Sequence, residues 1–113
     1  MTKKERDAAW EKERKRWTEE HLGDDCWLCG GKNSPRTHEI IFGLGNRKRC
    51  LLFARLCGDC HGTSDRGAHG INADAYRLIL LREALRREPD RTREILFRDW
   101  PQVAQELGLV RRG

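Results

Sequence analysis

Two cysteine pairs constrain this chain more than any other feature of its sequence. They are Cys26-x-x-Cys29 and Cys57-x-x-Cys60, and 27 residues separate them. Two residues between ligands let one tight turn direct both sulfurs at the same ion, and four thiolates fill the tetrahedral shell of Zn²⁺. We therefore predict one structural zinc ion, with no coordination position left for a reacting water. A redox pair or unrelated cysteines are the alternatives, but paired motifs at this spacing are typical of zinc sites. Cys50 is left over and receives no role.

The composition indicates a chain that needs such a site. Its 113 residues suit one compact domain with arms. Charged residues make up 36% and hydrophobic residues only 37%, so the apolar core must be small. The longest apolar runs are too short to span a bilayer, and the first residues are charged rather than apolar. We expect no membrane partner and a cytoplasmic location, where disulfides are rare.

Positive charge gathers around the cysteines. The whole chain carries a net charge of +5, and residues 26–71 contribute +4 of it. Phosphate is the commonest partner of a basic patch, although such a patch also serves solubility. The candidate phosphate contacts are the basic side chains of this segment, namely Arg36, Arg47, Lys48, Arg49 and Arg66.

The sequence predicts an α+β fold, with a small zinc-stabilised core flanked by helices. Residues 3–21 have helical composition, and Trp10 and Trp17 share one face that we expect to dock on the core. Residues 37–42 favour a strand, whereas residues 51–56 fit either a strand or a turn of helix. The resulting segments are a charged N-terminal helix over 1–25, a zinc-knuckle module over 26–71 and a helical segment over 72–113.

The C-terminal segment carries its own helix signals. Asn72 is a suitable N-cap, and Pro89 and Pro101 divide the segment into shorter helices. The apolar face of the first of these helices is predicted to consist of Ala75, Leu78, Ile79, Leu81, Ala84 and Leu85.

A second constellation lies between and after the cysteine pairs. A zinc clamp would draw the strand that carries His38 and Glu39 back toward His61, which directly follows Cys60. Alternation along a strand puts His38 and Glu39 on opposite faces, so only one of them reaches a given site. Asp65 shares a face with His61 if that segment is helical. The residues offer metal ligands and a base, or else a core histidine beside a plain zinc-binding module.

The order Cys-x-x-Cys-Gly, His-Glu-Ile and Leu-Cys-x-x-Cys-His over residues 26 to about 70 resembles the HNH endonuclease family. It is similar to small phage-type members with zinc knuckles and, in layout, to endonuclease VII. The resemblance implies a ββα-metal core that binds a divalent ion such as Mg²⁺ or Mn²⁺ and hydrolyses DNA phosphodiesters. It also implies a bacterial host or phage-encoded setting, and leaves open a homodimer or a place in larger phage recombination machinery.

Individual roles follow from the same resemblance. His61 matches the metal-binding histidine, and Asp65 matches the second ligand of the helix. His38 is the favoured general base with Glu39 as ligand or orienter, while the other alignment makes His38 the ligand and Glu39 the base. Leu52 stands where the family usually has an asparagine. Two other functions therefore stay open: a DNA-binding module that does not cleave, and a protein-interaction adaptor that uses the N-terminal tryptophan helix.

Overall fold

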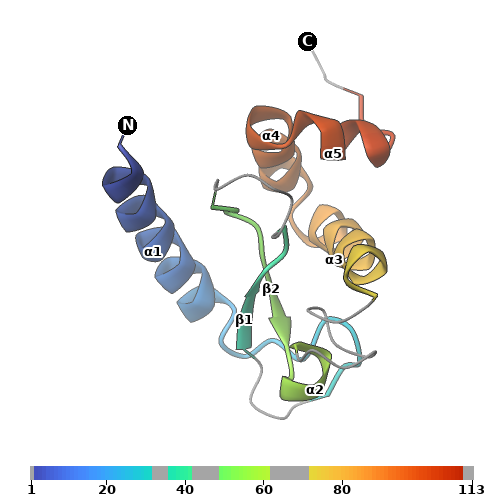
Figure 1. Cartoon of the computed structure of the whole chain (residues 1–113). Coiled ribbons are helices and arrows are strands. Elements are labelled where there is room, and N and C mark those ends of the chain that lie inside the picture. The colour runs from blue at the N-terminus through green and yellow to red at the C-terminus, as the bar shows by residue number, and fades with distance from the viewer. Residues whose placement is uncertain (1, 32–35, 42–48, 62–71, 111–113) are drawn as a thin grey trace.

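The structure, a computed structural model, describes residues 2–31, 36–41, 49–61 and 72–110. A two-stranded hairpin lies at the centre, with helix α1 on one side and helices α3 to α5 on the other (Figure 1). The short helix α2 follows the hairpin at one end. Among the helices that these ranges contain, none combines the length and apolar character needed to cross a bilayer.

Helix α1 (Lys3–Glu20) begins with a capping box and docks through its two tryptophans. The Thr2 hydroxyl accepts a hydrogen bond from the Glu5 amide at 3.1 Å, which satisfies one of the free donors of the first turn. The Trp10 indole Nε1 donates to the carbonyl of Cys50 at 3.0 Å, and Trp17 is only 1% exposed. The predicted helix and its docking on the central module are both confirmed.

The hairpin settles the ambiguous segment in favour of a strand. β1 (Arg36–Glu39) pairs antiparallel with β2 (Phe53–Leu56), and His38 lies opposite Ala54 while Glu39 lies opposite Phe53. Paired residues share a face, and successive residues alternate between faces. One face of the hairpin, which carries Glu39 and Phe53, is therefore turned toward α1, as the contact between the Phe53 and Trp10 rings shows. The other face carries His38 and turns toward α2 (Gly58–His61) and α3 (Ala73–Arg87).

The C-terminal segment is helical as predicted, but its predicted apolar face is partly wrong. Prolines occupy the first turns of α4 (Pro89–Asp99) and α5 (Pro101–Glu106), where a missing N–H costs nothing. In α3 the buried residues are Leu80, Leu81 and Ala84, whereas Leu78 and Ile79 are 38% and 48% exposed. Four consecutive apolar residues allow more than one helical phase, and packing against the hairpin selects the phase that buries Leu80. Asn72 sits at the N-cap, but its side chain makes no capping hydrogen bond.

One hydrophobic core joins the middle and C-terminal segments. It runs from Cys26 and Ile40 through Leu56 to Leu80 and Leu96, each of them at most 3% exposed. The observed architecture is mixed helix with a small two-stranded sheet, which agrees with the predicted α+β class.

Candidate metal centre

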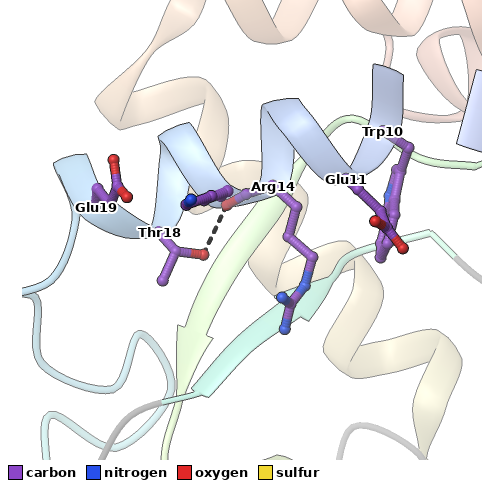
Figure 2. Close-up of a pocket in the computed structure, with 6 residues that line it drawn as sticks. Trp10, Glu11, Arg14, Thr18 and Glu19 are labelled. Atoms are coloured by element: carbon purple, nitrogen blue, oxygen red, sulfur yellow. Dashed lines mark hydrogen bonds between the residues drawn. The ribbon is translucent and has the colours of Figure 1, made fainter. Parts of the chain in front are cut away.

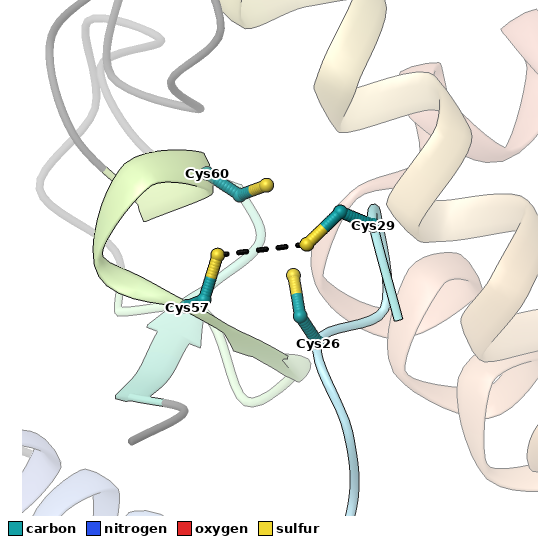
Figure 3. A group of neighbouring side chains, drawn as sticks. All are labelled: Cys26, Cys29, Cys57 and Cys60. Atoms are coloured by element: carbon teal, nitrogen blue, oxygen red, sulfur yellow. Dashed lines mark hydrogen bonds between the residues drawn. The ribbon is translucent and has the colours of Figure 1, made fainter. Parts of the chain in front are cut away.

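Two turns bring the four paired cysteines together, as Figure 3 shows. Their four sulfurs all lie within 4.8 Å of one another, and Sγ of Cys29 lies 3.6 Å from Sγ of Cys57. A tetrahedral zinc ion with Zn–S bonds of about 2.3 Å requires sulfur-to-sulfur distances of about 3.8 Å. The donor set and the spacing therefore fit a single Zn²⁺, and the predicted convergence of the thiols is confirmed.

The first turn owes its shape to the glycine that follows its second cysteine. Gly30 has φ +73°, in the left-handed region that favours glycine. This conformation lets the Gly30 amide donate to the carbonyl of Cys26 at 2.8 Å, while the Cys26 amide donates to the carbonyl of Gly31 at 3.0 Å. The Gly31 amide then donates to Sγ of Cys29 at 3.4 Å. The turn thus aims both sulfurs the same way and supplies a backbone donor to one of them.

The thiols differ in how readily they lose a proton. Burial raises the pKa of Cys26, but backbone amides, that of Cys57 foremost, donate to its sulfur and bring its pKa down to about 7. The pKa of Cys60 is raised, first by burial and then by the sulfurs around it. One thiolate therefore forms easily in this cluster, whereas further thiolates repel it unless a cation is present.

The two predicted histidines lie side by side next to the sulfurs. The rings of His38 and His61 have centroids 5.2 Å apart and an interplanar angle of 81°. His61 ends α2, directly after Cys60, and its amide donates to the carbonyl of Cys57 at 2.9 Å. His38 is only 2% exposed, while His61 is half-buried. The cysteine turn therefore places His61 against the strand that carries His38.

Glu39 lies on the other face of the hairpin. Its Oε1 accepts a hydrogen bond from the Cys50 amide at 2.6 Å, and its Oε2 lies 3.8 Å from Nη1 of Arg49. Burial raises its pKa, although the Cys50 amide and Arg49 oppose that effect. Strand alternation thus brings His38, and not Glu39, to His61.

The remaining predicted site residues are only partly described. Arg36 is exposed at the start of β1, and the side chain of Arg49 is 47% exposed. Leu52, at the position of the family's asparagine, is 2% exposed within the core. The predicted metal ligand Asp65 lies outside the described residues, and so do three predicted DNA contacts, namely Arg47, Lys48 and Arg66.

Sequence reasoning missed a buried arginine in this region. Arg55 on β2 is 5% exposed, and its Nη1 donates to the hydroxyl of Thr37 at 2.9 Å. Burial lowers the pKa of its guanidinium. A charged residue in a short strand gives no local sign that α1 will cover it.

Comparison with protein-family models, with curated proteins and with solved structures finds no match to this chain in any of the three. What the site can do therefore follows from its own residues. The four cysteines could hold one metal ion such as Zn²⁺, and the rings of His38 and His61 pack against each other where the second cysteine turn ends.

Proposed function

We propose that this chain is a metal-dependent DNA endonuclease of the HNH type, stabilised by a structural zinc ion. The observation that carries the proposal is the His38–His61 pair, held 5.2 Å apart beside the four-cysteine cluster. His38 acts as the general base that activates water. His61, together with Asp65, would hold Mg²⁺ or Mn²⁺, which would stabilise the charge that develops on the phosphate and the leaving oxygen; Glu39 is excluded as a ligand because it lies on the other face of the hairpin.

The zinc centre has a positioning role in this proposal. Cys57 directly follows β2, and Cys60 directly precedes His61. Joining these two sulfurs to Cys26 and Cys29 holds α2 against the hairpin, and with it the ring of His61 against the ring of His38. Loss of zinc should therefore abolish activity as well as stability, even though the ion has no open coordination position.

The two histidines differ in their exposure to solvent, and so in how accessible they are to a substrate. His38 is almost fully buried, whereas His61 is half-buried. Of the two rings, that of His61 is therefore the one that a phosphate in solution would reach first. Arg36, two residues before His38, points to the same face of the hairpin and is exposed, so it is placed to contact the backbone of the bound strand.

A nicking assay tests the proposal. The zinc-loaded protein should convert supercoiled plasmid to nicked circles when Mg²⁺ or Mn²⁺ is added. His38→Ala should lower the rate by about 100-fold or more, because a positioned general base contributes on that order. His21→Gln is the matched control: His21 caps α1 and contacts Asp24, away from the pair, and this variant should nick like the wild type.

Two results would contradict the endonuclease. One is a wild-type protein that fails to nick the plasmid with every divalent metal that is tested. The other is a His38→Ala variant that is as active as the wild type. Because His38 is buried, zinc content and thermal melting must show that the variant is folded. His61→Ala, at a half-buried position, provides a second variant if His38→Ala does not fold.

A DNA-binding module that does not cleave is the second candidate, and one observation favours it. Leu52 fills the core at the position where the family usually has an asparagine, so that side chain adds no polar group to the site. Salt-dependent DNA binding without nicking, in both the wild type and His38→Ala, is the outcome that this candidate predicts. The adaptor hypothesis is less favoured, because Trp17 is buried against the hairpin rather than presented to a partner.

A further inference from the structure

We propose that a basic hollow on the α1 side of the hairpin binds the phosphate backbone of nucleic acid, as a contact separate from the histidine pair. The hollow lies where α1, the segment before β2 and the end of α4 meet, and it encloses about 470 Å³. Its lining includes Arg6, Trp10, Arg49, Leu51, Arg98 and Asp99. They come from three segments that are distant in the sequence.

Charge distinguishes this hollow from its neighbour. A second hollow of about 550 Å³ lies along α1 on the other side of Trp10, and Figure 2 shows its lining. There, two basic residues, Arg14 and Lys15, are balanced by Glu11 and Glu19. The lining of the first hollow instead has three guanidinium groups and one carboxylate, and two further carboxylates, those of Asp7 and Glu39, contact Arg49 at longer range. The lining itself is therefore net positive and favours an anion.

The three arginines are not equally engaged. Arg98 already binds Asp99 through contacts of 3.1 and 3.0 Å. Among the described residues, the ion pairs of Arg49 are long, at 3.6 Å to Asp7 and 3.8 Å to Glu39. Within the described part of the chain, Arg6 makes no ion pair at all. Two guanidinium groups thus keep donor capacity for a ligand.

Trp10 makes the site rigid. Its indole Nε1 donates to the carbonyl of Cys50 at 3.0 Å, which fixes the ring against the segment before β2. The Arg49 guanidinium lies over that ring, 4.5 Å from its centroid, and its side chain is 47% exposed. A guanidinium packed against an aromatic ring loses less freedom on binding than an unrestrained one, and its donors match the oxygens of a phosphate.

This hollow and the histidine pair lie on opposite faces of the hairpin. Glu39 and Phe53 turn toward α1 and the hollow, whereas His38 turns toward α2. The inference rests on the nucleic-acid partner of the proposed function, but not on any chemistry at His38. A phosphate contact here would add to the DNA footprint and raise affinity without touching the scissile bond.

Binding of a fluorescein-labelled DNA duplex of about 20 base pairs, followed by anisotropy without added divalent metal, tests the inference. The variant Arg6→Gln/Arg49→Gln removes the two guanidinium groups that would donate to phosphate. Arg82→Gln/Arg86→Gln is the matched control, because it removes the same charge from exposed positions on α3. Arg6→Gln alone tests the hollow independently of Arg49, because Arg49 is also one of the backbone contacts predicted from the sequence.

The first variant should bind at least about tenfold more weakly, and its salt dependence should fall by about two in slope, one for each lost phosphate contact. Arg6→Gln should show about half that change in slope. The control should bind within about threefold of the wild type, since exposed charges away from the contact act only through a screened field. Melting temperatures should confirm that all the proteins are folded.

Several outcomes would overturn the inference: equal losses in the variant and its control, an unchanged salt slope, or a wild type that does not bind the duplex. Competition by poly-L-glutamate as strong as that by unlabelled DNA would do the same, because it would show recognition of charge rather than phosphate. If the wild type does not nick DNA but the variants lose binding as expected, the endonuclease proposal fails and the phosphate-binding hollow stands. If the wild type nicks DNA but Arg6→Gln/Arg49→Gln binds the duplex as tightly as the wild type, the hollow fails and the endonuclease proposal stands.

Discussion

Replacing Cys29 by serine tests whether Cys29 is a metal ligand or an ordinary exposed cysteine. Cys29 is exposed, so in a chain without metal the change from thiol to hydroxyl should alter the free energy of unfolding by less than about 0.5 kcal/mol. With zinc bound, the change removes one of four ligands. Structural zinc contributes about 10 kcal/mol in small domains, and an equal share for each thiolate is about 2.5 kcal/mol.

That loss is large enough to measure in two ways. For a domain of this size, about 2.5 kcal/mol lowers Tm by about 10 °C. Metal analysis by mass spectrometry should show that the wild type holds one zinc per chain and that Cys29→Ser holds much less. Chelator titration should strip the variant at lower concentration than the wild type, because a three-thiolate site binds more weakly.

Cys50→Ser is the matched control, since it makes the same chemical change at the cysteine outside the cluster. Cys50 is 0% exposed, and burial raises the pKa of its thiol to about 12, so it stays protonated. Its replacement should destabilise the core by about 1–3 kcal/mol while zinc content remains unchanged. A Cys29→Ser protein with full zinc content and an unchanged Tm would refute the assignment of the four-cysteine centre.

Three further outcomes are expected. Hydrogen bonds from Arg16 and Arg91 lower the pKa of Glu13. Its carboxylate therefore stabilises the fold above the unfolded pKa of about 4.5, and this stabilisation is lost as the pH falls. In urea unfolding, Glu13→Gln should lower the free energy of unfolding by about 0.5–1 kcal/mol at pH 7 and leave it unchanged in acid. Gly30→Ala meets no atom within 4 Å but is strained at φ +73°, so it should cost about 1 kcal/mol and speed zinc loss to a chelator. Thr92→Val removes a buried 3.1 Å hydrogen bond to a carbonyl in α3 and should lower stability by about 1 kcal/mol, whereas Thr92→Ser should retain most of it.

Local spacing in the sequence was sufficient for the metal centre and for most helices. Cys26 and Cys29, like Cys57 and Cys60, are close enough along the chain that one turn orients each pair. Helix α1 has its capping residues, Thr2 and Glu5, within its own first turn. Each turn and the helix cap depend on contacts over a few residues, which the order of the residues shows directly. The meeting of the two turns was predicted because all four sulfurs suit one ion, although the contact between Cys29 and Cys57 spans 28 positions.

The tertiary structure decided what depends on contacts between distant segments. The run at 78–81 allows several helical phases, and only packing against the hairpin selects the phase that buries Leu80. Residues 51–56 fitted a strand or a helical turn until β1 supplied hydrogen-bonding partners for 53–56. The same pairing put His38 beside His61 and turned Glu39 toward Arg49. The basic hollow needed three segments to meet around Trp10, and no pattern within any one of them predicts that meeting, because burial and charge at a surface are sums over neighbours that are remote in the sequence.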